Sequence, residues 1–201
     1  MSYKRVLLVI FVLVLAWSAI RPHDYFTWWL EVFPAVIGVV LVLAAARRFP
    51  LTPLLLTLLV IHAMILMLGG HYTYAEVPLG FWMERAFGFT RNNYDRIGHF
   101  AQGFVPAIVA REILIRRDVV RKRGWLFVVV VAICLAISAL YELLEWQVAI
   151  HTGSKGDAFL GTQGDVWDTQ EDMGTALVGA ITALLVLSRV HDRQIASLDS
   201  R

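Results

Sequence analysis

Apolar residues fall into six long runs along this chain, and polar or charged segments separate the runs. A helix needs about 20 mostly apolar residues to cross the ~30 Å hydrocarbon core of a bilayer. The runs predict membrane-spanning helices over residues 6–20, 26–46, 51–68, 97–115, 125–146 and 173–188. They therefore predict an all-α fold, a polytopic transmembrane helix bundle of about six spans. Because too few residues remain outside the runs for a soluble domain, residues 1–201 are expected to form a single integral membrane domain.

The composition supports this interpretation, since 58% of the residues are hydrophobic and 17% are charged. Soluble globular chains have about 45–50% apolar residues, which makes a water-soluble fold a poor match. Membrane lipid is the expected partner, nothing in the sequence indicates nucleic acid, and the oligomeric state is left open. The one cysteine, Cys134, excludes disulfides and cysteine-based zinc sites.

The first apolar run has two interpretations. Lys4 and Arg5 precede it, and Ala16-Trp17-Ser18 is a weak match to a signal-peptide cleavage site. The bulky Trp17 and Ile20 favour a retained helix instead. The orientation of the other spans does not depend on this choice.

Charged residues divide unequally between the two alternating sets of connections. The set that includes both termini has twelve basic and three acidic residues, whereas the other set has five basic residues, Lys155 among them, and twelve acidic residues. Basic loops remain in the cytosol. Both termini are therefore expected to be cytosolic, and the two long connections, 69–96 and 147–172, are expected to face outward.

Three ionisable residues share one depth in the last three predicted spans. His99, Glu142 and Asp172 each lie 17 residues from the cytosolic boundary of their span. That separation is about 25 Å at a rise of 1.5 Å per residue. Ionisable groups inside lipid are costly unless they face a protein interior, a partner or water. The three helices are therefore expected to turn these side chains toward one another, around a pocket that opens to the outside.

A second set of carboxylates lies about one turn closer to the outer surface. Asp95, Glu145 and Asp168 are three or four residues from the first set, so each helix carries its pair on one face. Carboxylates this close cannot all ionise without compensation. A divalent metal ion, an arginine and histidine network that includes Arg96, or retained protons would each supply it.

These residue types suggest specific roles. Imidazole nitrogens and carboxylate oxygens bind divalent cations, so the candidate metal ligands are His99, Asp95, Glu145, Asp168 and Asp172. The candidate catalytic residues are Glu142, as a general base, and His99. A divalent metal ion is the one cofactor considered, and the sequence leaves open whether the protein is an enzyme.

Other residues are expected to have structural roles. His62 is expected to be a packing residue and His71 to be exposed in a loop. Arg111 is expected to extend toward the inner headgroups, and the cytosolic halves of the spans contain almost no other polar group. Small residues recur four positions apart in the last span and predict close helix packing, at Thr175, Gly179 and Ala183.

Three segments, residues 93–100, 141–146 and 161–174, carry a resemblance to a known family. Together with the hydropathy profile they resemble the YjdF-like family of bacterial inner-membrane proteins over most of the chain. The resemblance implies a multi-pass protein of the bacterial inner membrane.

VanZ-like membrane proteins are also similar, at motifs matched here by Asp95, Arg96, His99, Glu142, Glu145, Asp168, Asp172, Thr175 and Gly179. The chain departs from those motifs by placing Glu145 where Gln is usual, Asp172 where Asn is usual and Thr175 where Gly is usual. These departures make the expected pocket more acidic. The VanZ resemblance implies a link to envelope stress or glycopeptide tolerance.

The sequence leaves three functions open. The first is an outward-facing acidic pocket that binds a divalent cation or a lipid-linked envelope headgroup, with metal-assisted hydrolysis or group transfer if it is catalytic. The second is a proton- or ion-coupled transporter. The third is a non-catalytic envelope-maintenance factor, in which the polar cluster only holds helices together. No His-Glu-x-x-His, Gly-x-Ser-x-Gly or P-loop motif is present, which excludes those common hydrolase and nucleotidase classes.

Overall fold

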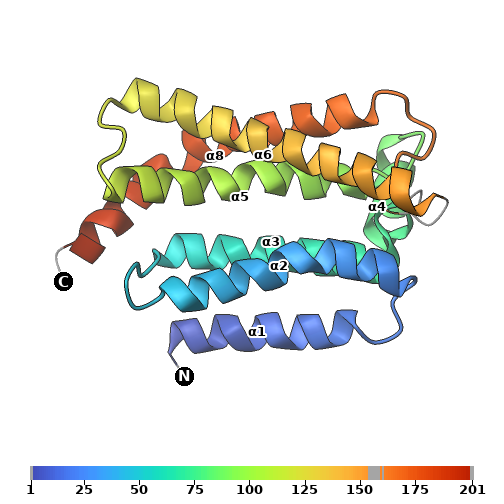
Figure 1. Ribbon diagram of the computed structural model, residues 1–201, viewed down its shortest axis with the longest axis horizontal. Helices are drawn as coiled ribbons and strands as arrows, with labels where there is room; N and C mark the ends of the chain where they lie inside the picture. The colour runs from blue at the N-terminus through green and yellow to red at the C-terminus, as the bar shows by residue number, and fades with distance from the viewer. Residues whose placement is uncertain (1, 154–158, 160, 200–201) are drawn as a thin grey trace.

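The computed structural model describes residues 2–153, 159 and 161–199, and within them the chain is all-helical, as predicted. The α-helices are α1 (Tyr3–Ser18), α2 (Tyr25–Ala45), α3 (Pro53–Tyr72), α4 (Pro78–Phe87), α5 (Tyr94–Arg116), α6 (Arg123–Thr152) and α8 (Asp168–Asp199). A short 3₁₀ turn, η1 (Tyr74–Glu76), precedes α4. The long helices run side by side, and α4 lies at one end of the bundle (Figure 1).

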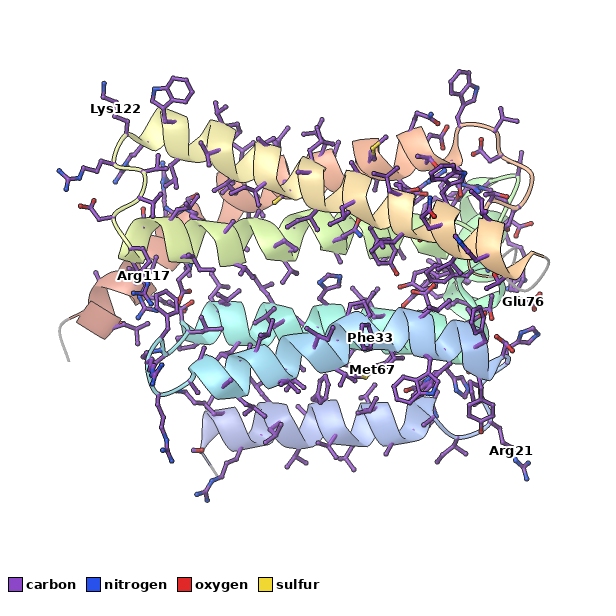
Figure 2. All side chains as sticks on the ribbon, in the orientation of Figure 1. Arg21, Phe33, Met67, Glu76, Arg117 and Lys122 are labelled. Atoms are coloured by element: carbon purple, nitrogen blue, oxygen red, sulfur yellow. The ribbon has the colours of Figure 1, made fainter. Side chains whose placement is uncertain are left out.

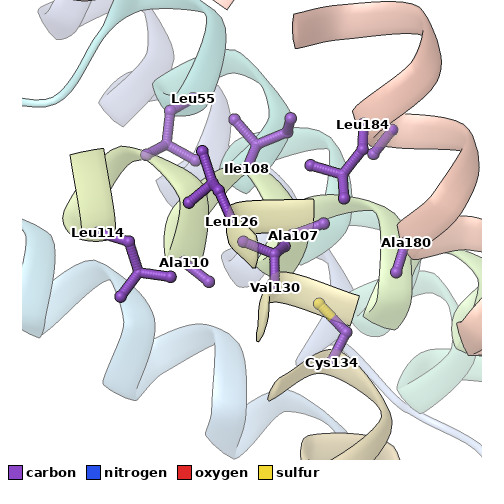
Figure 3. Close-up of a cluster of buried hydrophobic side chains, with 11 residues drawn as sticks. Leu55, Ala107, Ile108, Ala110, Leu114, Leu126, Val130, Cys134, Ala180 and Leu184 are labelled. Carbon is purple, nitrogen blue, oxygen red and sulfur yellow. The ribbon is translucent and has the colours of Figure 1, made fainter. Parts of the chain in front are cut away.

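The long helices form two groups (Figure 1). One group contains α1, α2 and α3, and the other contains α5, α6 and α8. Helix α5 joins the groups because it packs against α8, α6 and α3. Figure 3 shows an apolar core formed mainly by α5, α6 and α8, where Ile108, Leu126 and Leu184 lie, and to which α3 adds Leu55.

Helices α5 and α8 approach each other backbone to backbone. A Cβ atom added to Gly103 would lie 1.8 Å from the carbonyl oxygen of Ala176, and one added to Gly179 would lie 2.2 Å from that of Phe100. Only glycine permits contact this close. The predicted close packing is present at Gly179, and Ala183 is fully buried, whereas Thr175 is half-buried.

Four helices are long and apolar enough to cross a membrane, namely α2, α3, α6 and α8. Helix α1 has 16 residues, and α5 carries charged residues along its length. The prediction of about six spans thus stays a prediction for α1 and α5. Two helices continue beyond the spans predicted at 125–146 and 173–188: α6 extends to Thr152, and α8 covers Asp168–Asp199. Polar residues that favour helices extend both elements beyond their apolar runs.

The two ends of the bundle differ in charge. Helix α1 begins and α8 ends at the same end (Figure 1). Figure 2 shows Arg117 and Lys122 at this end, and Arg21 and Glu76 at the opposite end. We call these the basic end and the acidic end. Lys155 lies outside the described residues.

Asp24 fixes the start of α2 at the acidic end. Its Oδ2 accepts a hydrogen bond from the Thr27 amide at 2.7 Å. This hydrogen bond lowers the pKa of Asp24 below its usual value. The carboxylate therefore stabilises the fold at pH values above its unfolded pKa of ~3.9, and the stabilisation is lost as the pH falls through the lower folded pKa.

Asp24→Ala is expected to lower the free energy of unfolding by about 1 kcal/mol at neutral pH, the usual cost of a lost helix cap. Thermal unfolding in detergent between pH 3 and pH 7 measures the difference in stability between wild type and the variant. Wild type is expected to be the more stable at neutral pH and to lose that difference only near pH 3. An equal advantage at every pH would contradict the capping role.

A buried polar cluster lies at the basic end and corrects two expectations. Arg111 does not extend toward lipid: its guanidinium donates to Asp192 Oδ1 at 2.5 Å and contacts His191 Nδ1 at 3.0 Å. Glu112 is fully buried and accepts hydrogen bonds from Thr52 Oγ1 at 2.7 Å and His191 Nε2 at 2.9 Å. Polar groups are thus present in this half of the bundle, because α8 extends far enough to bring His191 and Asp192 against α5.

Candidate functional site

Three helices bring four ionisable residues together near the acidic end. Asp95 and His99 lie one turn apart on α5, Glu142 lies on α6, and Asp172 lies on α8. His99 Nε2 is 3.4 Å from Asp95 Oδ1 and 3.7 Å from Asp172 Oδ1. His99 Nδ1 is 3.7 Å from Glu142 Oε1 and 3.1 Å from the side-chain oxygen of Gln102. His99 is therefore at the centre of the cluster.

Two arginines neutralise the outer side of this cluster. Arg96 donates to Asp172 Oδ1, and also to Asp168 Oδ1 at 3.1 Å and to Glu171 Oε2 at 2.7 Å. Arg91 donates to Asp168 Oδ1 at 2.5 Å. The two arginines therefore compensate part of the negative charge, and they do so at the carboxylates of α8, including Asp168 and Asp172.

The loop before α8 is tied directly to the start of α5. The side chain of Gln163 donates to the Asn92 carbonyl at 2.8 Å and accepts from the Asn92 amide at 3.2 Å. Arg91 Nη1 donates to the Thr162 carbonyl at 2.7 Å. These contacts join the segment 161–174 to the residues just before α5, and they hold Asp168 and Asp172 against α5.

The predicted metal ligands separate into two sets. Asp95, His99 and Asp172 each offer one ligand atom, and these atoms all lie within 4.8 Å of one another. Asp168 is held by both arginines. Glu145, on α6, lies apart from both sets and lines a cavity with Asp95 and His99.

This cavity has a volume of about 220 Å³ and lies between the two helix groups. We call it the acidic cavity. Its polar lining includes Glu31 of α2, Asp95 of α5 and Glu145 of α6, with Tyr74 and Tyr141 nearby. Three carboxylates from three helices thus face one space.

Glu31 was not predicted as a site residue. It is 5% exposed although it lies in an apolar helix. Its position inside the predicted span 26–46 was an available signal, because an ionisable residue in a span usually has a function or a partner. The common depth of ionisable residues concerned only the last three predicted spans, and Glu31 lies in the second.

Helix α6 carries buried polar atoms without a hydrogen-bond partner among the described residues. They are Ser138 Oγ, Tyr141 Oη and Glu142 Oε1. Glu142 is only 7% exposed. Tyr141 lines the acidic cavity. Buried polar atoms are normally hydrogen-bonded, so its unpaired hydroxyl is suited to contact a ligand, ion or water there.

Helix dipoles act unequally on the site. Asp95 lies in the first turn of α5 and Asp168 in that of α8, where the positive end of the helix dipole favours an anion. Glu142 and Glu145 lie toward the carboxyl end of α6, where the dipole does not help them. A bound cation would stabilise these two carboxylates most.

The remaining histidines have different surroundings. His62 lines the acidic cavity, and its expected packing role stays a prediction. His71 is not in a loop, since it lies in the last turn of α3, 3.0 Å from the Ser18 carbonyl.

Residues 3–193 match the family described as "Predicted membrane protein (DUF2238)". The chain is 55% identical over 183 residues to the "Inner membrane protein YjdF" of Escherichia coli (strain K12), covering 91% of this chain and 88% of that protein. No solved structure matches the chain. The chain belongs to the YjdF family, and it is accordingly a multi-pass protein of the inner membrane with a helical-bundle fold.

Proposed function

We propose that this protein binds a divalent cation in an outward-facing pocket, with Asp95, His99 and Asp172 as ligands. The observation that carries the proposal is the convergence of three ligand atoms from two helices within 4.8 Å. Metal–ligand bonds of ~2.0–2.2 Å allow one ion to bridge atoms at the observed 3.4 Å and 3.7 Å.

The charge balance supports a cation. Arg91 and Arg96 are committed to the α8 carboxylates. Among the described residues, Asp95, Glu142 and Glu145 form no ion pair with an arginine, and His99 is the basic side chain that contacts Asp95 and Glu142. Buried carboxylates without a counter-charge are costly, so the pocket favours a positively charged ligand.

The proposed orientation places the acidic end on the outer side of the inner membrane. It has both termini in the cytosol and six crossings, including α1 and α5. The segregation of basic and acidic connections along the sequence supports this arrangement. A lipid-linked envelope headgroup in the outer leaflet would then reach the pocket directly.

If the site is catalytic, metal-assisted hydrolysis is the reaction class that its groups suit. The cation would polarise the substrate oxygen, and Glu142 would accept the proton of the attacking water. The unpaired Oε1 of Glu142, 3.7 Å from His99, supports this role.

Metal analysis of detergent-purified protein tests the proposal. Wild type is expected to retain about one divalent metal ion per chain, because the three proposed ligands form one site. Asp172→Asn and His99→Ala are expected to lose it. The matched control is Glu76→Gln, which removes an exposed carboxylate at the same end of the bundle.

The proposal fails if wild-type protein, dialysed against each common divalent cation, contains no metal and keeps the same thermal stability in chelator. Metal retained undiminished in both ligand variants would also overturn the assignment.

A further inference from the structure

A second cavity adjoins the acidic cavity. It is also about 220 Å³ in volume and lies among α1, α2 and α3. We call it the apolar groove. Pro34, His62 and Leu66 line both spaces, so the groove and the acidic cavity share a wall. A long molecule would therefore be able to occupy both.

The groove has the dimensions of a lipid chain. On α3 its lining extends from Leu51, just before the helix, to Leu66. At 1.5 Å per residue these positions span about 22 Å, most of the ~30 Å hydrocarbon core. The lining is apolar except for Lys4 at the basic end and His62 beside the acidic cavity. A space of this length and chemistry suits an acyl or prenyl chain.

Space for the chain is left by a glycine. A Cβ atom added to Gly38, which lines the groove, would meet nothing within 4 Å. The groove at this position is therefore open, and it is not filled by neighbouring side chains.

The acidic cavity favours a cationic headgroup. Glu145 is 8% exposed and has no hydrogen bond or ion pair among the described residues. Glu31 and Asp95 face the same space, and no arginine or lysine lines it. Ile137 also lines the cavity and is 40% exposed, so the cavity reaches the lipid-facing surface of α6. A membrane amphiphile has a direct route into it.

We infer that the two spaces together bind one membrane amphiphile, with its chain in the apolar groove and an ammonium-bearing headgroup between Glu31 and Glu145. This inference rests on the proposed function for the outward orientation of the pocket. It adds the class of ligand, an amine-headed lipid, and the residues that select it.

The test uses a photoactivatable phosphatidylethanolamine with the reactive group in its chain, added to the purified full-length protein. Labelling is expected at peptides of α1, α2 and α3, with phosphatidylethanolamine preferred over a matched phosphatidylglycerol by roughly tenfold, the size of one charge-assisted contact. Gly38→Leu fills the groove and is expected to reduce labelling to a similar extent. Gly124→Leu is the matched control, because Gly124 also has open space around it but lies outside the groove.

Paired replacement of Glu31 and Glu145 by Gln is expected to abolish the preference while leaving labelling of the groove in place. Excess free ethanolamine separates two sources of the ammonium group. Weak competition supports a lipid ligand, and full competition at equal concentration overturns the two-part site. Equal labelling of Gly38→Leu and wild type, or equal labelling by the two lipids, also overturns it.

Metal content distinguishes failure of this inference from failure of the cation site. Gly38→Leu is expected to retain the metal bound by wild type. Lipid selectivity in a protein without metal would leave the amphiphile site standing and remove the metal site. Bound metal in a protein without lipid selectivity would leave the metal site standing and remove the amphiphile site.

Discussion

Gly103→Ala is expected to lower the free energy of unfolding by about 3 kcal/mol or more, because the added methyl group overlaps a backbone carbonyl that cannot rotate away. The Cβ atom would lie 1.8 Å from the Ala176 oxygen, so α5 and α8 must separate. Gly179→Ala meets the Phe100 oxygen at 2.2 Å and is expected to have a similar effect. Denaturant titration in mixed micelles measures the change.

The matched control is Gly38→Ala, since a Cβ atom there meets nothing within 4 Å. Alanine in a helix interior is otherwise better than glycine by about 0.5–1 kcal/mol, so this variant should not lose stability. Equal effects of Gly103→Ala and Gly38→Ala would contradict the close approach of α5 and α8. That approach also sets the distance between His99 and Asp172, so the Gly103 variant should lose metal as well.

Glu112→Ala is expected to cost about 3–5 kcal/mol, because removal of one partner leaves buried charge uncompensated. The carboxylate receives hydrogen bonds from Thr52, His191 and Arg116, the last at 3.0 Å. A guanidinium has only donors, so Arg111 donates to His191 Nδ1, and His191 Nε2 carries the proton that Glu112 accepts. In the variant, Thr52, His191 and Arg116 each lose the carboxylate that accepts their hydrogen bond.

Glu112→Gln should lose less, since the amide oxygen still accepts hydrogen bonds. Arg121→Ala, which breaks the exposed pair with Asp118, should cause no measurable loss. Similar unfolding curves for Glu112→Ala and Arg121→Ala would show that the buried cluster does not hold α8 against α5.

The apolar runs predicted the six long helices because each run is long enough for several helical turns, and neither Pro34 in α2 nor Pro106 in α5 ends its helix. The common depth of His99, Glu142 and Asp172 depends only on helical rise, which explains why three positions far apart in sequence lie close together in the structure. Helix ends were less predictable, since α8 continues beyond its apolar run to Asp199.

Partners across helices were the least predictable feature. Arg111 pairs with Asp192, a contact that requires the unpredicted extension of α8. Glu31 faces Glu145 because the α1–α3 group packs on α5, and no periodicity in the sequence encodes that choice of neighbour. Which groups neutralise the buried carboxylates depends on such contacts. The sequence could therefore predict only a set of alternatives, namely a metal ion, an arginine and histidine network, or retained protons.

Electron–nuclear double resonance of Mn²⁺ bound to protein with ¹⁵N-labelled histidine tests the cation site most directly. We predict a ¹⁵N coupling from a single imidazole in wild type and in His62→Gln, and its loss in His99→Gln. Mn²⁺ that stays fully hydrated in wild type, or a coupling that persists without His99, would contradict cation binding by Asp95, His99 and Asp172.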